Sequence, residues 1–203
     1  MIKTVIFDLG RVIVPFDFYR VYTGLETLTG IPAADLYKAR PTDLVNVFET
    51  GQMTPRDFAR EYCDRLKIAV PYEKFCDLWC SIFFPETLVP EQLLRNIARN
   101  YRLVLLSNTN VIHFEMIQRT YPLLGHFHDM VLSYQAGVMK PSPLIYQRAI
   151  EAAECRADEC FFTDDVAEYI KGAREQGINA VQFESAIQIE AELNRRGVVT
   201  LFE

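Results

Sequence analysis

The chain has 203 residues, of which 50% are hydrophobic and 24% are charged, a balance typical of folded globular proteins. Its formal net charge of −6 at pH 7 argues against a general affinity for nucleic acid or anionic membranes. No apolar run is long enough to span a bilayer, no secretion signal is evident, and the five cysteines show no C-x-x-C spacing. We therefore expect a cytoplasmic protein with reduced thiols and with neither nucleic-acid nor membrane partners.

Short β-type runs alternate with helical patterns along most of the chain. The predicted strands are Thr4 to Phe7, Leu103 to Leu106, Met130 to Leu132, Cys160 to Thr163 and Ala180 to Phe183. The predicted helices between and after them are Glu91 to Asn100, Ile112 to Thr120, Leu144 to Glu154, Ala167 to Gln176 and Ile187 to Arg195. This alternation predicts an α/β fold, a doubly wound parallel sheet with helices on both faces.

One long stretch breaks this alternation. Residues 16–85 show apolar residues at helical spacing and no convincing strand, with helix stops at Gly30-Ile31-Pro32, Gly51 and Val70-Pro71. The pattern predicts four or five helices inserted after the first strand. We therefore expect an α/β core of residues 1–15 and 86–203 and a helical insertion of residues 16–85.

Polar side chains follow four of the predicted strands at the points where those strands end. They are Asp8, then Ser107-Asn108-Thr109, then Lys140, and finally Asp164-Asp165. Ligands of open parallel sheets bind in the crevice beyond the carboxyl ends of the strands. The sequence therefore predicts that three carboxylates, a hydroxyl and a lysine converge on one site.

Four ordered motifs make the prediction more specific. They are F-D-L-G-R-V at 7–12, L-S-N-T at 106–109, K-P at 140–141 and F-F-T-D-D at 161–165. In this order they resemble the motifs of the haloacid dehalogenase (HAD) superfamily, and the resemblance covers the whole chain. It implies a HAD-like Rossmannoid core with a C1-type helical cap. The F-D-L-G start with S-N-T-N looks closest to bacterial sugar-phosphate phosphatases of the α-D-glucose-1-phosphate type.

The resemblance implies a nucleophile and a metal site. Asp8 would attack the phosphate and form an aspartyl-phosphate, and Mg²⁺ would be the cofactor. Asp8, the Gly10 carbonyl and Asp165 would supply metal ligands, with Asp164 behind them. Mg²⁺ prefers oxygen ligands in near-octahedral geometry, which a few carboxylates, waters and a substrate phosphate provide.

The remaining motif residues would bind phosphate. Lys140 would place its positive charge against the phosphate oxygens and pair with Asp164. Ser107 and the backbone N–H of Asn108, which we expect at the start of a helix, would hold the transferring group. The substrate would be a small phosphorylated molecule, with sugar phosphates ahead of nucleotide monophosphates.

Each of these residues also has a purely structural interpretation. Asp165, followed by Glu168, fits the spacing of a helix N-cap. Ser107 and Asn108 could cap the helix that follows them, and Lys140 could be a solvated lysine in a turn. Asp8 is harder to explain in this way, because a carboxylate that ends a buried strand is costly without compensating charge.

The sequence departs from the usual phosphatase pattern at Gly10. Most phosphatases of the superfamily carry there a second aspartate, which serves as general acid and base, a role worth about 10²–10⁴-fold in rate. One explanation is a substrate with a good leaving group, or water or a substrate hydroxyl in place of the missing acid. The alternatives are a metal-free 2-haloacid dehalogenase that uses Asp8, and a non-catalytic binding protein on the same scaffold.

Several other residues suggest sites of their own. His126 and His128 could form a metal site, although no third ligand is evident and structural roles are favoured. His113 could approach the crevice and act as a substitute acid. Aromatic residues of the insertion, beginning with Phe16, could line the pocket or only pack the insertion. We expect a monomer or a homodimer.

Overall fold

A single five-stranded parallel sheet organises the computed structural model, which describes residues 1–200. Its strand order is β3-β2-β1-β4-β5, so the first strand lies at the centre. The strands are β1 (Thr4–Phe7), β2 (Arg102–Ser107), β3 (Asp129–Leu132), β4 (Cys160–Asp164) and β5 (Asn179–Gln182). The predicted doubly wound sheet is confirmed, and the strand boundaries differ from the expected ones by no more than one residue.

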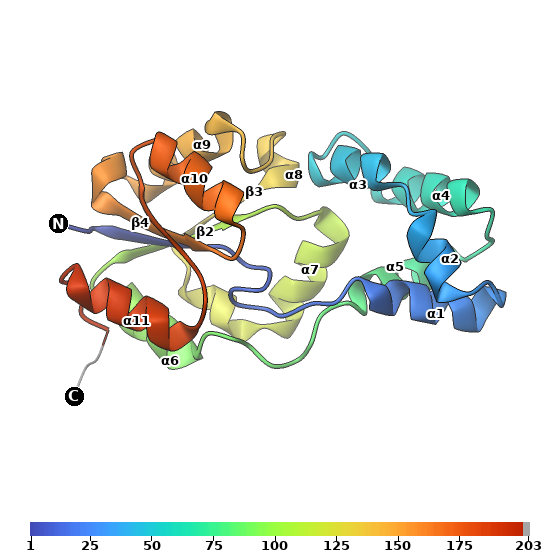
Figure 1. Ribbon diagram of the computed structural model, residues 1–203, viewed down its shortest axis with the longest axis horizontal. Coiled ribbons are helices and arrows are strands. Elements are labelled where there is room, and N and C mark those ends of the chain that lie inside the picture. The colour runs from blue at the N-terminus through green and yellow to red at the C-terminus, as the bar shows by residue number, and fades with distance from the viewer. Residues whose placement is uncertain (201–203) are drawn as a thin grey trace.

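Helices cover both faces of this sheet (Figure 1). α9 (Pro143–Ala153) and α10 (Ala167–Glu175) lie on one face, and α6 (Glu91–Ala98), α7 (Val111–Thr120) and α11 (Ala186–Arg195) lie on the other. The central strand shows why both faces are apolar. Val5 and Phe7 pack with one helical layer while Ile6 packs with the other, because successive strand side chains point to opposite faces.

The remaining short elements connect these layers. They are two 3₁₀ helices, η1 (Pro122–His126) and η2 (Ala157–Glu159), and one turn of α-helix, α8 (Ser133–Ala136). Gly137 ends α8 with a positive φ of 73°, which glycine adopts without steric cost. Among residues 1–200, no helix is both long and apolar enough to cross a bilayer.

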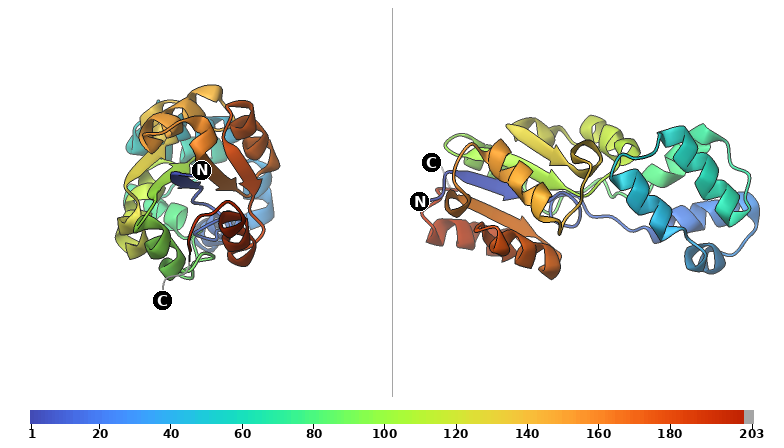
Figure 2. Two further views of the ribbon diagram at one scale, coloured as in Figure 1. Left: turned by 90° about the vertical axis from the view of Figure 1, so that its left-hand side faces the viewer. Right: turned by 90° about the horizontal axis from the view of Figure 1, so that it is seen from above.

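Five helices between β1 and α6 form a separate group beyond the carboxyl ends of the strands (Figures 1 and 2). They are α1 (Tyr19–Thr29), α2 (Ala33–Lys38), α3 (Thr42–Glu49), α4 (Pro55–Leu66) and α5 (Tyr72–Cys80). This five-helix group has a hydrophobic core of its own, in which Trp79 stacks on Phe75 with ring centroids 5.7 Å apart. The expected run of helices is therefore present, with five members.

Two chain crossings join the five-helix group to the sheet. They run side by side and are linked by an isolated antiparallel bridge between Phe16 and Phe83. A third contact lies at Gly51, just after α3, where a β-carbon would approach the backbone oxygen of Tyr134 to 2.1 Å. The φ of Gly51 is also positive, at 70°, so only glycine fits this close approach between α3 and α8.

Candidate active site

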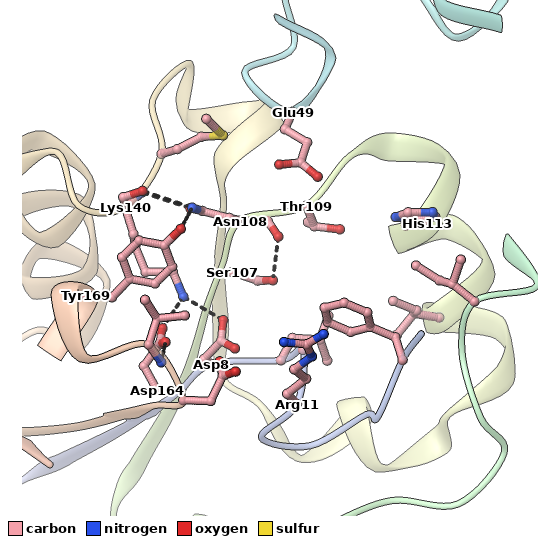
Figure 3. A pocket seen from close by; sticks show the side chains of 18 of the residues that line it. Asp8, Arg11, Glu49, Ser107, Asn108, Thr109, His113, Lys140, Asp164 and Tyr169 are labelled. Atoms are coloured by element: carbon pink, nitrogen blue, oxygen red, sulfur yellow. Dashed lines mark hydrogen bonds and ion pairs between the residues drawn. The ribbon is translucent and has the colours of Figure 1, made fainter. Parts of the chain in front are cut away.

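A buried lysine bridges two buried carboxylates at the carboxyl edge of the sheet (Figure 3). Lys140 Nζ donates hydrogen bonds to Asp8 Oδ1 at 2.6 Å and to Asp164 Oδ2 at 2.5 Å. Its third donor reaches the backbone oxygen of Leu106 at 3.1 Å. Lys140 is only 3% exposed, so the alternative of a solvated turn lysine is wrong.

Burial and neighbouring charge have opposite effects on the pKa values of Asp8 and Lys140. Burial raises the pKa of Asp8 to about 7, and the neighbouring ammonium of Lys140 limits that rise. For Lys140, burial favours the neutral amine, but Asp8 and Asp164 outweigh it and raise its pKa above the usual range. The lysine therefore stays charged, and the protonation state of Asp8 responds to further positive charge placed beside it.

A third carboxylate completes an acidic cluster. Oxygen atoms of Asp8, Asp164 and Asp165 lie within 4.8 Å of one another. Both oxygens of Asp164 are engaged, Oδ2 by Lys140 and Oδ1 by the backbone N–H of Val166 at 2.9 Å. Asp165 is partly exposed in the same pocket, and burial raises its pKa. The arrangement suits Mg²⁺, with Asp8 and Asp165 as ligands and Asp164 behind them.

The alternative interpretation of Asp165 as a helix N-cap is wrong. The residue at the N-cap position of α10 is Val166, and the carboxylate that accepts the backbone N–H of Val166 belongs to Asp164. Asp165 contributes its backbone oxygen to the Gln182 amide instead, at 2.9 Å. Its side chain is therefore not engaged as a helix cap.

Ser107 ends β2 and Asn108 begins the loop that follows it, so neither residue lies at a helix start. α7 begins at Val111, and its N-cap is Asn110, whose side chain accepts the backbone N–H of His113 at 3.1 Å. Both the expected helix start and the capping alternative are therefore wrong for Ser107 and Asn108. The Ser107 hydroxyl has only a long contact of 3.5 Å to the Asn108 carbonyl and faces the pocket.

The side chain of Asn108 binds the backbone of Lys140 on both sides. Its Oδ1 accepts the Lys140 N–H at 2.8 Å, and its Nδ2 donates to the Lys140 carbonyl at 3.0 Å (Figure 3). The same Nδ2 approaches the Tyr169 hydroxyl at 3.4 Å. The amide group thus holds the loop that carries the lysine, a role that the sequence did not suggest.

Gly10 lies in a tight turn after Asp8. An isolated bridge joins Gly10 to Val14, and Arg11 between them has a positive φ of 58°. The Arg11 guanidinium lies over the Phe16 ring, 4.8 Å from its centroid, and both residues line the pocket. Arg11 therefore adds a cation to the site, which the motif comparison had not assigned.

The three histidines have structural partners. His113 is buried, with Nε2 2.9 Å from the Trp79 carbonyl and Nδ1 3.0 Å from the Asn110 amide. Burial lowers its pKa to about 4, so it is neutral and its nitrogens are both occupied. His126 Nε2 pairs with Glu91, whereas His128 Nδ1 accepts the backbone N–H of Leu103. A substitute acid at His113 and a metal site at His126 and His128 are therefore unsupported.

The pocket reaches from the acidic cluster to the five-helix group. It has a volume of about 280 Å³ and is lined by the motif residues, by Phe16, Phe18, Ile82 and Phe83, and by Asn46 and Glu49 of α3. The sequence did not single out Asn46 or Glu49, because no local pattern connects α3 with the strand ends. Figure 3 shows the Glu49 carboxyl group directed into this pocket.

Comparison with known proteins assigns the family. A protein-family model described as haloacid dehalogenase-like hydrolase matches residues 2–177 of the sequence. The chain belongs to this family of hydrolases. The superfamily predicted from four short motifs is thereby confirmed, together with its α/β fold.

A curated sequence and a solved structure, both from Bacteroides thetaiotaomicron, are similar along nearly their whole length. A D-ribitol-5-phosphate phosphatase is 28% identical over 201 residues, which cover 95% of this chain and 97% of the relative. A HAD family enzyme, solved in complex with magnesium and inorganic phosphate, has a TM-score of 0.79 at 26% identity. That comparison covers 91% of this chain and 96% of the other.

A third similarity concerns the fold alone. L-2-haloacid dehalogenase from Xanthobacter autotrophicus has a TM-score of 0.64 at 16% identity, covering 98% of this chain and 85% of that one. The same architecture therefore occurs in a protein with a different chemistry. The side chains of the site, and not the architecture, have to decide between them.

Proposed function

We propose that this hydrolase cleaves a small phosphate monoester with the help of Mg²⁺, using the carboxylate of Asp8 as nucleophile. The observation that carries the proposal is the acidic cluster with one buried cation. Asp8 and Asp164 share Lys140, while Asp165 lies within metal-ligand reach of both carboxylates. The relative solved with magnesium and inorganic phosphate supports the same assignment.

Different residues of the site would bind the metal, bind the phosphate and position Lys140. Mg²⁺, when held by Asp8, Asp165 and the Gly10 carbonyl, would offset the charge of the phosphate against the attacking carboxylate. Lys140 adds a second positive charge, and Ser107 with the Asn108 N–H donates hydrogen bonds to phosphate oxygens. Asn108 keeps Lys140 in place through its backbone.

The reaction has two steps. A carboxylate oxygen of Asp8 attacks phosphorus, the aspartyl-phosphate forms, and the bond from phosphorus to the ester oxygen breaks. The departing oxygen takes a proton from water or from a substrate hydroxyl, since Gly10 has no side chain to supply one. Water then attacks phosphorus, regenerates the Asp8 carboxylate and releases inorganic phosphate.

We propose a sugar or polyol phosphate as the substrate. The D-ribitol-5-phosphate phosphatase of Bacteroides thetaiotaomicron, similar over nearly the full length, supports this class. A pocket of about 280 Å³ is at the small end of ligand sites, which favours a compact ester over a nucleotide.

We further propose that residues 16–85 act as a cap on a core of residues 1–15 and 86–203. The five-helix group lies beyond the carboxyl ends of the strands and contributes lining residues to the pocket. Its closure would exclude water and complete the substrate site. The paired crossings at Phe16 and Phe83 are the natural hinge.

The 2-haloacid dehalogenase alternative receives less support. Displacing a halide requires no leaving-group acid, so Gly10 is compatible with it. A metal-free dehalogenase, however, requires no third carboxylate beside Asp8 and Asp164. The likeness to L-2-haloacid dehalogenase, at 16% identity, concerns the fold alone. A non-catalytic binding role does not explain why the charged residues Asp8, Lys140 and Asp164 are buried together at the pocket.

The test is phosphate release from a panel of sugar, polyol and nucleotide monophosphates, with Mg²⁺ and with EDTA. Release should require the metal and should disappear in Asp8→Asn. Asp35→Asn, an exposed carboxylate on α2, is the matched control and should behave like the wild type. Release that persists in EDTA or in Asp8→Asn would refute the mechanism, and halide release from 2-haloacids would favour the alternative.

A further inference from the structure

Two polar side chains of α3 face the pocket without partners. Asn46 and Glu49 lie three residues apart, hence on one face of the helix, and both line the pocket. Within the described part of the chain, neither side chain has a recorded hydrogen bond or ion pair. They are also the only lining residues that α1 to α5 contribute.

The position of Glu49 is unfavourable for a purely structural residue. It is the last residue of α3, where the negative end of the helix dipole disfavours a carboxylate. It is also partly buried, and burial raises its pKa to about 7 with no neighbouring cation to oppose the rise. A carboxylate that is partly desolvated and has no partner among the pocket residues is suited to receive hydrogen bonds from a ligand.

The backbone around Glu49 is held firmly against the core. Gly51 follows two residues later, and its close approach to the Tyr134 carbonyl admits no side chain. This contact places the end of α3 over the pocket edge opposite Asp8. The phosphate end of a ligand would then lie at Asp8 and Lys140, and its other end would lie at Asn46 and Glu49.

We propose that Asn46 and Glu49 bind hydroxyl groups of the substrate's unphosphorylated part, so that the pocket selects a phosphorylated polyol or sugar. The inference rests on the proposed phosphatase function and adds the groups that recognise the substrate. A carboxylate accepts hydrogen bonds from two neighbouring hydroxyls, and an amide both donates and accepts. A second phosphate at this end would be repelled by Glu49, which disfavours bisphosphates.

The experiment compares two esters that differ only in hydroxyl groups. Steady-state kcat/KM is measured for a pentitol phosphate and for n-pentyl phosphate, with the wild type, Glu49→Ala, Glu49→Gln and Asn46→Ala. Loss of a hydrogen bond to a charged group should lower kcat/KM for the pentitol phosphate by about 10–100-fold in Glu49→Ala. The value for n-pentyl phosphate should change by less than about threefold.

Three controls accompany these measurements. Glu49→Gln keeps the shape and one acceptor oxygen, so its loss should be smaller than that of Glu49→Ala. Glu26→Ala removes an exposed glutamate of α1 and should leave both esters unaffected. Thermal unfolding of each variant separates a folding defect from a binding defect.

Four results would overturn the inference. An equal loss for both esters would assign Glu49 to the chemistry or to folding, and an unchanged value for the pentitol phosphate would remove it from substrate binding. If the wild type hydrolyses both esters equally well, the proposed function stands and the recognition of hydroxyls fails. If it hydrolyses neither ester with Mg²⁺, both proposals fail.

Discussion

The ring of Phe16 occupies the space that a side chain at position 10 would need. A β-carbon on Gly10 would lie 2.7 Å from Phe16 Cε1, well inside the contact distance of carbon atoms. The ring is itself held edge-on by Phe18 and Phe83, with centroids 5.2 and 6.1 Å away. The missing second aspartate and the aromatic residue are therefore one coupled feature of the pocket.

Gly10→Asp should destabilise the protein by about 1–3 kcal/mol, because the ring of Phe16 has to move out of a packed cluster. In Phe16→Ala the space is open, so the same aspartate should cost less. The coupling is measured by urea unfolding of the two single variants and the double variant. Strictly additive free energies of unfolding would show that Phe16 does not restrict position 10.

Asn108→Ala should lower kcat of the proposed hydrolysis by about 10–100-fold, since both backbone hydrogen bonds that position Lys140 are lost. Asn179→Ala is the matched control. Its amide group likewise forms two hydrogen bonds to the backbone, both donated to carbonyls, those of Asp158 and Cys160, but it lies on β5 at the sheet edge. A similar drop in kcat for both variants would mean that the effect on activity is a general loss of stability.

Mg²⁺ binding should weaken as the pH falls below about 7. Burial raises the pKa of Asp8 to about 7, and a metal ligand must be deprotonated, so the ion has to displace a proton at lower pH. Proton release is measured by calorimetry in buffers of different ionisation enthalpy, at pH 6 and pH 8. We expect release at pH 6 that nearly disappears at pH 8, and none in Asp8→Asn at either pH.

Glu49 should make the wild type less stable as the pH rises. Its pKa is raised from 4.5 to about 7, so between these values the folded state binds more protons than the unfolded state. The free energy of unfolding therefore falls as the pH rises through this interval. Urea unfolding should show Glu49→Gln gaining about 1–2 kcal/mol on the wild type between pH 5 and pH 8. A pH-independent difference would mean that Glu49 titrates normally.

Much of the fold could be predicted from the sequence. Buried strands such as Thr4–Phe7 are short β-branched and aromatic runs, and helices such as Ala167–Glu175 have apolar residues at helical spacing. The polar residues at the strand ends could be predicted to meet, because parallel strands bring their carboxyl ends to one edge. The end of the Asp8 strand and the acidic pair after the fourth strand were found in this way.

Errors arose where a local pattern had more than one solution. The spacing of Asp165 and Glu168 matches a helix cap, yet the neighbouring Asp164 accepts the backbone N–H near the start of α10. Ser107 and Asn108 precede a helix, but Asn110 caps it. In both cases the alternative differs by one to three residues of register, which short-range propensity does not resolve.

The resemblance of four short motifs was enough to predict the family, and the geometry of parallel sheets was enough to predict that the polar strand ends, with the carboxylates of the acidic cluster, meet. What surrounds these residues depends on tertiary packing. Phe16 fills the space beside Gly10, Asn108 holds Lys140, and Glu49 reaches the pocket from α3. The last two contacts join residues that are distant in the chain, and the distances in all three follow from packing, which no single segment encodes.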